Sequence, residues 1–236
     1  MKNKIIYIFF LILLVSCSKV KREFYNNGNL KSIGKINYKN DKEGEWKFYH
    51  KNKQLALVGE FENGKENGEW KEYFENGKLK AIGKKRNGKY IGEWKYFNEN
   101  GDLKAIQSNS NDGIYEKYFY PNGNLKLERT IKKGKIGMTK LYYENGKIKG
   151  YGPTKGNYRE GLWKMYYKNE QLQAIGSYKN GSQTGLWSVY YDNGVLKEKG
   201  NYENGFKKGS FIGYDKEGKI EYTSEYSSKI KSITIN

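Results

Sequence analysis

Cys17 and His50 are the only cysteine and the only histidine in this 236-residue chain, so few residues could supply a nucleophile, a base or a metal ligand. His50 stands where other parts of the chain carry aromatic residues, which favours a structural role. Glu75, Glu99 and Glu144 recur beside turns and lack the contrasting environments that acid-base catalysis needs. The glycine-rich stretches have no strand-loop-helix context of a phosphate loop. The sequence predicts no enzyme, no metal site and no cofactor.

The N-terminus has the pattern of an export signal. Lys2 and Lys4 precede an apolar run of eleven residues, 5–15, and small residues follow it. A membrane-spanning helix needs roughly 20 residues, so this run is too short to remain in a bilayer. A buried apolar strand is the alternative. The basic start and the short apolar run favour a secretory signal peptide over residues 1–16.

The end of this segment carries a candidate modification site. Leu14-Val15-Ser16-Cys17 resembles the lipobox of bacterial lipoproteins, in which the cysteine receives a diacylglycerol thioether and becomes the mature N-terminus. The resemblance implies a lipidated N-terminus at residues 17–18 and an exported protein anchored to the cell envelope. Ser18 follows the cysteine instead of Asp, which implies the outer membrane if the organism is Gram-negative. A lone exported cysteine also cannot form an intramolecular disulfide.

The rest of the chain repeats one phrase, and this repeat must position any functional side chain. Only 36% of residues are hydrophobic, but 16% are aromatic, with 29 Gly and 2 Pro, and mean hydropathy is −0.97. Aromatic residues with frequent Gly-containing turns are typical of short strands. Repeats 1 to 9 are numbered here by a turn residue that recurs every 22 to 25 positions: Gly28, Lys53, Gly77, Gly101, Gly123, Gly146, Glu170, Gly194 and Gly218.

Each repeat predicts a β-hairpin. Leu or Ile stands two residues after each turn residue and Tyr or Phe four before it; all five tryptophans stand seven before it: Trp46, Trp70, Trp94, Trp163 and Trp187. We expect Asn76-Gly77 to form a two-residue type I′ turn, since that turn needs positive φ at both residues. The pairing would place Trp70 over Gly83 in its own hairpin, and likewise Trp163 opposite Gly176 and Trp187 opposite Gly200, although Trp94 would face Gln107.

Alternation along the strands predicts two different faces. One face would carry the structural tryptophans, and the other would carry a candidate binding surface of Lys71, Tyr73, Lys80, Lys95 and Lys104. A second turn, such as Asn63-Gly64, connects each hairpin to the next in most repeats. The pattern predicts an all-β, elongated, single-layer antiparallel meander of about nine hairpins of some 24 residues over 19–223, with no helix beyond the signal peptide and a cap or tail over 224–236. Two stretches are irregular, 107–116 and 137–160, the latter with Thr139 where Trp is expected.

The phrase "GEWKEYFENGKLKAIGKKRNGK" resembles the MORN repeat variant of bacterial YwqK-like proteins, and the resemblance covers residues 19–223. It implies a tandem hairpin array. Members of that family are often labelled antitoxins, and eukaryotic MORN repeats are associated with membrane attachment and protein scaffolding. The export signal departs from a cytosolic antitoxin and leaves an exported antitoxin-like or immunity-like role.

The net charge limits the classes of partner that the protein could bind. Without Lys2 and Lys4, 42 of the 44 basic residues remain against 26 acidic ones, a net charge of +16. Only four basic residues are Arg, the residue that dominates forked or stacked recognition, so specific nucleic-acid binding is disfavoured. A protein partner, anionic lipid or an acidic envelope polymer suits the charge better. We expect a non-enzymatic, membrane-anchored binding lipoprotein; the alternative is a structural envelope spacer with no specific ligand.

Overall fold

The computed structural model describes residues 19–132, 135–227 and 231–235. The expected signal peptide and Cys17 lie outside these residues. The described residues contain no helix, and this confirms the all-β prediction. The strands are β1 (Lys19–Phe24), β2 (Leu30–Ile36), β3 (Lys42–Tyr49), β4 (Leu55–Glu62), β5 (Lys65–Tyr73), β6 (Leu79–Arg86), β7 (Lys89–Phe97), β8 (Leu103–Ser110), β9 (Gly113–Phe119), β10 (Leu125–Ile131), β11 (Ile136–Tyr142), β12 (Ile148–Lys155), β13 (Tyr158–Arg159), β14 (Gly161–Tyr166), β15 (Leu172–Lys179), β16 (Ser182–Tyr190), β17 (Leu196–Glu203), β18 (Phe206–Tyr214), β19 (Ile220–Tyr226) and β20 (Lys231–Ile235).

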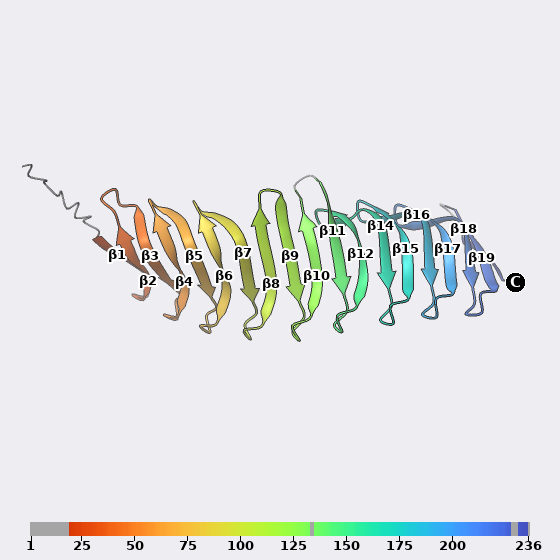
Figure 1. Cartoon of the computed structure of the whole chain (residues 1–236), viewed down its shortest axis with the longest axis horizontal. Helices are drawn as coiled ribbons and strands as arrows, with labels where there is room; N and C mark the ends of the chain where they lie inside the picture. The colour runs from red at the N-terminus through yellow and green to blue at the C-terminus, as the bar shows by residue number, and fades with distance from the viewer. Residues whose placement is uncertain (1–18, 133–134, 228–230, 236) are drawn as a thin grey trace, which may run out of the picture. The chain divides into compact units, whose positions relative to one another are not determined.

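The strands belong to two units, one of Met1–Gly77 with Lys85–Lys89 and one of Lys78–Lys84 with Tyr90–Asn236. In the first unit, each of β1 to β4 pairs antiparallel with the next strand in sequence. In the second unit the same holds from β7 to β12, and β12 then pairs with both β13 and β14. The pairing continues without a crossover to β20 (Figure 1). Each unit is therefore a meander of hairpins, as predicted.

The first turn of each repeat is present nine times, but its predicted type was wrong. The amide of Gly77 donates to the carbonyl of Phe74 at 2.9 Å, and Gly77 has φ +81° whereas Asn76 is not among the residues with positive φ. Three residues, 75–77, thus form a loop in which a type I turn is followed by a left-handed glycine. Asn-Gly fits this turn as well as it fits type I′, so the dipeptide alone could not distinguish them.

A bulge restores the register that the longer loop would have shifted. In repeat 7, Tyr166 pairs with Leu172 and Met165 with Ala174, which leaves Gln173 as the extra residue. Because one residue joins the loop and one leaves the ladder, the strands beyond the bulge keep the predicted pairing. Trp163 therefore lies opposite Gly176, and Trp187 opposite Gly200, as predicted.

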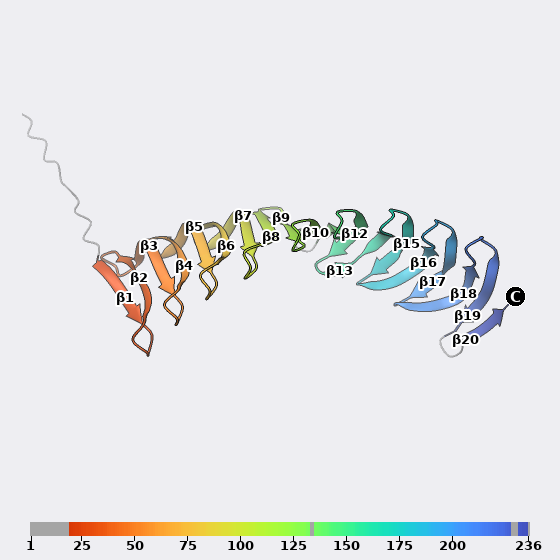
Figure 2. The same ribbon diagram turned by 90° about the horizontal axis from the view of Figure 1, so that it is seen from below.

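The second turns do have the type I′ conformation. Asn63 and Gly64 have φ of 49° and 77°, and the same pattern recurs at Asn180-Gly181. A bulge follows each of these turns: in repeat 8 the pairing shifts between Ile175 and Ser177, where Gly185 has φ +67°. Bulges of this kind bend a strand and increase its twist. Figure 2 shows the resulting bend along β15 to β17 of the second unit.

Candidate binding surfaces

The tryptophans form the core of each unit on one face of its sheet, called the tryptophan face below. Single-layer sheets offer little apolar area, so these side chains carry most of the burial. All five are between 0% and 4% exposed, and Phe211, which takes the same position in repeat 9, is 1% exposed. The predicted structural role of the five tryptophans agrees with this burial.

Each indole covers the glycine of the preceding repeat, which corrects the expected contact within one hairpin. A Cβ added to Gly176 would lie 2.1 Å from the ring of Trp187, and one added to Gly152 would lie 2.5 Å from Trp163. The Trp94 ring likewise covers Gly83. The tryptophan therefore joins two repeats, and the apparent exception of Trp94 opposite Gln107 disappears.

This pairing across repeats is a rule that sequence reasoning missed. Gln107 replaces the glycine where the next repeat has Glu116 in place of Trp, and the two residues are register partners. Arg129 replaces the glycine where the next repeat has Thr139, again as register partners. Glycine is present wherever an indole or the Phe211 ring must be covered and absent where neither follows. The signal was a covariation between one repeat and the next.

Aromatic rings continue the core between successive tryptophans. From Trp163 to Tyr226, successive rings have centroids 5.0 to 6.3 Å apart and planes 69° to 87° from parallel. Edge-to-face pairs of this kind are favourable beyond their area burial. The resulting column consists of Trp163, Tyr178, Trp187, Tyr202, Phe211 and Tyr226.

A second set of contacts joins the repeats near their first turns. His50 belongs to this set: its Nε2 lies 2.9 Å from the carbonyl oxygen of Tyr73. His50 replaces a tyrosine at this position, so the structural role predicted for it fits its contacts. In five other repeats a tyrosine hydroxyl at this position donates to a carbonyl of the next repeat at 2.7 to 2.9 Å, from Tyr25, Tyr120, Tyr143, Tyr167 and Tyr191.

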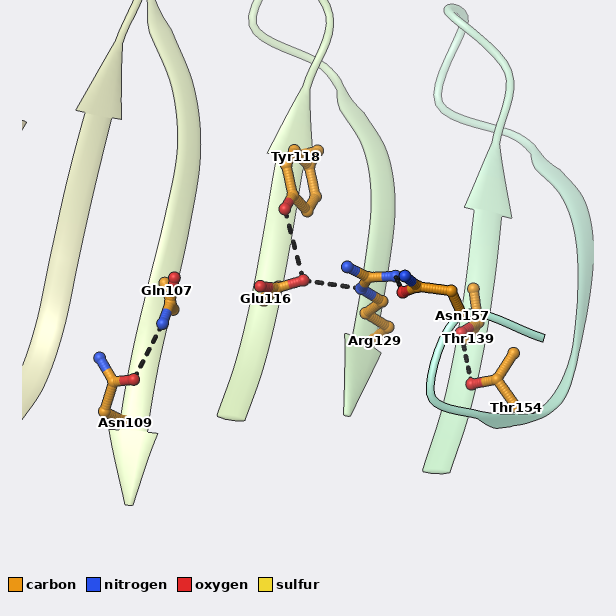
Figure 3. A network of polar contacts seen from close by, with 8 residues as sticks. All are labelled: Gln107, Asn109, Glu116, Tyr118, Arg129, Thr139, Thr154 and Asn157. Carbon is orange, nitrogen blue, oxygen red and sulfur yellow. Dashed lines mark hydrogen bonds and ion pairs between the residues drawn. The ribbon is translucent and has the colours of Figure 1, made fainter. Parts of the chain in front are cut away.

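In repeats 5 and 6 a polar network takes the place of the aromatic core (Figure 3). Glu116 is 9% exposed and accepts a hydrogen bond from Nε of Arg129 at 2.6 Å. The Tyr118 hydroxyl donates to the same carboxylate at 3.4 Å, and Nη1 of Arg129 donates to Asn157 at 3.1 Å. The carboxylate stands at the tryptophan position of repeat 5, and Arg129, its register partner, stands at the glycine position of the same repeat.

Smaller polar contacts flank this ion pair on both sides. Gln107 donates to Asn109 at 2.9 Å, and the hydroxyls of Thr139 and Thr154 lie 3.0 Å apart. Nδ2 of Asn109 is buried and has no hydrogen-bond partner among the described residues. Buried polar groups cost stability unless they are paired. This stretch is thus the place in the second unit where the core depends on hydrogen bonds instead of rings.

Removing the arginine should reveal that dependence. We expect Arg129→Ala to lower the free energy of unfolding by about 2 kcal/mol, because it leaves the carboxylate of Glu116 poorly paired. Urea unfolding would measure the change. Lys95→Ala is the matched control, since the Lys95–Glu93 pair has side chains 49% and 51% exposed; surface pairs contribute about 0 to 1 kcal/mol. Equal losses in the two variants would contradict the role given to this network.

Of the predicted binding residues, Lys71, Tyr73 and Lys95 lie on the opposite face, called the lysine face below. Nζ of Lys71 is 2.9 Å from Glu69, and Nζ of Lys95 is 3.7 Å from Glu93. Lys80 is exposed; Lys104 is also exposed and stands in the bulge of repeat 4. Tyr73 is half-buried. The candidate residues are thus on the sheet surface, and Lys71 and Lys95 are each paired with a carboxylate two residues earlier.

One carboxylate on the lysine face is held firmly. The hydroxyls of Tyr115 and Tyr142 both donate to Glu128, and Nζ of Lys140 lies 3.2 Å from it. The Tyr115 hydroxyl is the main cause that holds the pKa of Glu128 below its usual range. Burial, with the adjacent carboxylate, raises the pKa of both tyrosines to about 12. Glu128 is therefore ionised and occupied with its neighbours, which makes it unsuitable as a proton donor.

The part of the chain that the structure describes offers little for metal or membrane chemistry. That part has no group of three or more His, Cys, Asp or Glu side chains placed to hold a metal ion, and no helix there has the length and apolarity to span a membrane. A hollow of about 460 Å³ lies along the first turns and is lined by Asn122, Asn124, Glu144, Asn145 and Lys168. Asn122 and Asn124 donate to the carbonyl of Glu144. These two side-chain amides are therefore engaged in hydrogen bonds between neighbouring turns.

Comparisons with known proteins bear on the repeat. No curated protein matches the chain in sequence. Two solved structures, crystal structures of TcdB2-TccC3 and of TcdB2-TccC3-TEV, align with 92% and 89% of this chain at 11% and 13% identity, with TM-scores of 0.22 and 0.19. The chain spans 13% of each of those chains, and TM-scores this low carry no argument.

The family comparison is decisive for the repeat. The sequence profile described as "MORN repeat variant" matches seven segments: residues 42–63, 66–84, 90–108, 114–133, 135–155, 159–180 and 183–204. These are repeats 2 to 8, and the structure adds hairpins with the same first turn at Gly28 and Gly218. End repeats of an array are commonly atypical because one side lacks a neighbour. With more than half of its residues matched and each match centred on a hairpin, the chain belongs to the MORN repeat variant family.

Proposed function

We propose that this protein is a non-enzymatic, lipid-anchored binding protein of the cell envelope. Tandem MORN repeats suggest a repeat protein that binds other molecules. The observation that carries the proposal is the asymmetry of each sheet: the tryptophan face supplies the core, and the lysine face remains a large patterned surface. Such a surface suits contact with a partner better than it suits catalysis, which needs a site that excludes water.

The anchor in this proposal is Cys17. We expect the wild-type protein to take up labelled palmitate when it is expressed in a bacterium, because the residues before Cys17 have the spacing of a lipoprotein signal. Cys17→Ala should abolish the label and leave the protein soluble or its precursor uncleaved. Ser18→Ala, next to the modified residue, is the control and should keep the label. A wild-type protein without label would contradict the anchor.

The ligand in this proposal is a protein or an acidic envelope component, and an electrostatic test separates the two. We expect residues 18–236 to bind anionic vesicles better than neutral ones, with weaker binding at about 0.5 M salt, where charges are screened beyond about 4 to 5 Å. Lys71, Lys80, Lys95 and Lys104 changed to Gln should reduce this binding. Glu69→Gln with Glu93→Gln should strengthen it, since both changes release an ion-paired lysine. If the affinity for vesicles did not change with salt or with these substitutions, a protein partner would be favoured.

An antitoxin-like or immunity-like role is one version of this proposal, and it requires a specific protein partner. The alternative is an envelope spacer, which is favoured by the regular contacts between neighbouring repeats. A spacer would tolerate replacement of the whole lysine face, whereas a binding protein would lose function after a few changes. Phenotypes of a strain carrying the four lysine changes would distinguish these roles.

A further inference from the structure

One row of the lysine face changes character along the chain. The row consists of the residue just before each tryptophan position. In repeats 2 to 4 this residue is acidic: Glu45, Glu69 and Glu93. In repeats 6 to 8 it is apolar and exposed: Met138 at 46%, Leu162 at 52% and Leu186 at 61%. Three exposed apolar side chains at equivalent positions differ from the scattered apolar residues of an ordinary surface.

The change also removes negative charge. In repeats 2 to 4 the glutamate neutralises the lysine two residues later, as in the Lys47–Glu45 pair at 3.1 Å. In repeat 7 Leu162 stands at that place beside Lys164, so the carboxylate is missing. In repeat 8 Ser188 stands at the position of that lysine, and its register partner Lys199 supplies the cation. Lys164 and Lys199 therefore place positive charge beside the two leucines, whereas Lys140 beside Met138 is paired with Glu128.

The row is held in place by the core. Leu162 and Leu186 each follow a glycine in the left-handed region, Gly161 with φ +65° and Gly185 with φ +67°. Each leucine also precedes a tryptophan that is at most 4% exposed on the other face. Bulges of this type redirect a side chain, and the buried neighbour fixes the backbone. The leucines thus stand out from ordered strands and not from loops.

The spacing of the row fits a helix. Met138 is on β11, Leu162 on β14 and Leu186 on β16, and one strand separates each from the next (Figure 1). Two strand spacings amount to about 9.6 Å. Residues seven apart on an α-helix are about 10.5 Å apart along its axis and lie on one face. An extended strand would turn successive third residues to opposite faces.

We propose that Met138, Leu162 and Leu186, bordered by Lys164 and Lys199, are a docking surface for an acidic amphipathic helix of a protein partner. The partner's apolar residues, seven positions apart, contact the row, and its acidic residues face the lysines. Ser177 and Asn201 are the register partners of the two leucines, and Ile136, 57% exposed, extends the apolar surface beside Met138. A row flanked by polar residues at both leucines suits a helix better than a broad lipid surface. This inference rests on the proposed binding function and names the partner class.

The probe for the test is a synthetic 21-residue peptide with leucines seven positions apart and glutamates beside them. Its helix is long enough to contact all three residues of the row. Binding of the fluorescein-labelled peptide to residues 18–236, which retain every described contact, is followed by anisotropy. The test variant changes Met138, Leu162 and Leu186 to Glu, the residue that repeats 2 to 4 carry there, so folding should be preserved. The control variant changes three exposed aromatic residues elsewhere to Glu: Phe24, Tyr38 and Phe206.

We expect the test variant to weaken peptide binding by about tenfold or more, because it loses apolar contacts and gains repulsion against the acidic peptide. The control variant, with the same change of net charge, should bind within about threefold of wild type. Circular dichroism and tryptophan emission verify the fold of each variant.

Three outcomes overturn the inference. One is a test variant that binds as wild type does, or a peptide that binds no better than its scrambled version. Another is a wild-type dimer that the test variant makes monomeric, which assigns the row to a second copy. The third is loss of anionic-vesicle binding in the test variant without loss of peptide binding. Palmitate labelling is independent of all three, so failure of this surface and failure of the proposed anchor can be told apart.

Discussion

Trp70→Ala should cost about 3 kcal/mol or more of the free energy of unfolding, as large-to-small core substitutions do. The indole is fully buried, lies against Gly59, and packs edge-to-face on Phe61 at 5.2 Å. Its Nε1 also donates to the carbonyl of Asn67 at 3.1 Å. Alanine removes all of these contacts, and a single-layer sheet has no second layer that could collapse into the space. Urea unfolding followed by circular dichroism would measure the loss.

Lys71→Ala is the control for this substitution, one residue away on the lysine face. Its partner Glu69 forms a surface ion pair with side chains 39% and 53% exposed. Such substitutions usually change stability by no more than about 0.5 kcal/mol. If the two variants unfolded at the same urea concentration, the assignment of the two faces would be wrong.

Gly176→Ala should be nearly as damaging, at about 3 kcal/mol, although it adds only one methyl group. The new Cβ would lie 2.1 Å from the Trp187 ring, so the indole must move. Movement would disturb its edge contact with Tyr178 at 5.0 Å and its hydrogen bond to the carbonyl of Ser177 at 3.1 Å. Because the indole belongs to the next repeat, hydrogen exchange should accelerate in β16 as well as in β15.

Gln107→Ala provides the matched control at the equivalent position of repeat 4. Its partner in the next repeat is Glu116 instead of an indole, so alanine meets no ring and should cost less than about 1 kcal/mol. A small loss at Gly176 together with a large one at Gln107 would refute the proposed pairing of glycine and tryptophan between repeats.

The repeat itself could be predicted because its signals are local and recur nine times. Alternation placed Trp70 and Lys71 on opposite faces, and counting from the turn gave the correct partner for Trp163. That count succeeded although the turn type was wrong, because the longer loop and the bulge after it compensate for each other. The strand register depends on the combined effect of loop length and bulge. The hydrophobic pattern determines that combined effect better than it determines the turn type or the bulge separately.

The contacts between repeats could not be predicted in the same way. Opposite residues such as Trp187 and Gly200 follow from pairing, but the direction in which an indole leans depends on its rotamer and on the twist between hairpins. The ion pair of Glu116 and Arg129 needed the same information, since the two residues lie in an irregular stretch. The ion pair of Lys71 with Glu69 could have been predicted, because residues two apart on one strand lie on the same face. Lys71 would then have been a weaker candidate for binding.

The contact of each glycine with the next tryptophan has a consequence for how such a gene can lengthen. Gly176 and Trp187 are joined by one continuous segment through a single second turn, and Gly152 and Trp163 are separated by the same number of residues. A tandem duplication of one whole period, wherever its endpoints fall, copies this segment intact and creates a new repeat that already fits both neighbours. A duplication that is not a whole number of periods breaks the repeat at its junction and puts the glycine and the ring out of phase there. The coding sequence can thus gain or lose whole periods by unequal recombination, and selection needs only to adjust the surface residues afterwards.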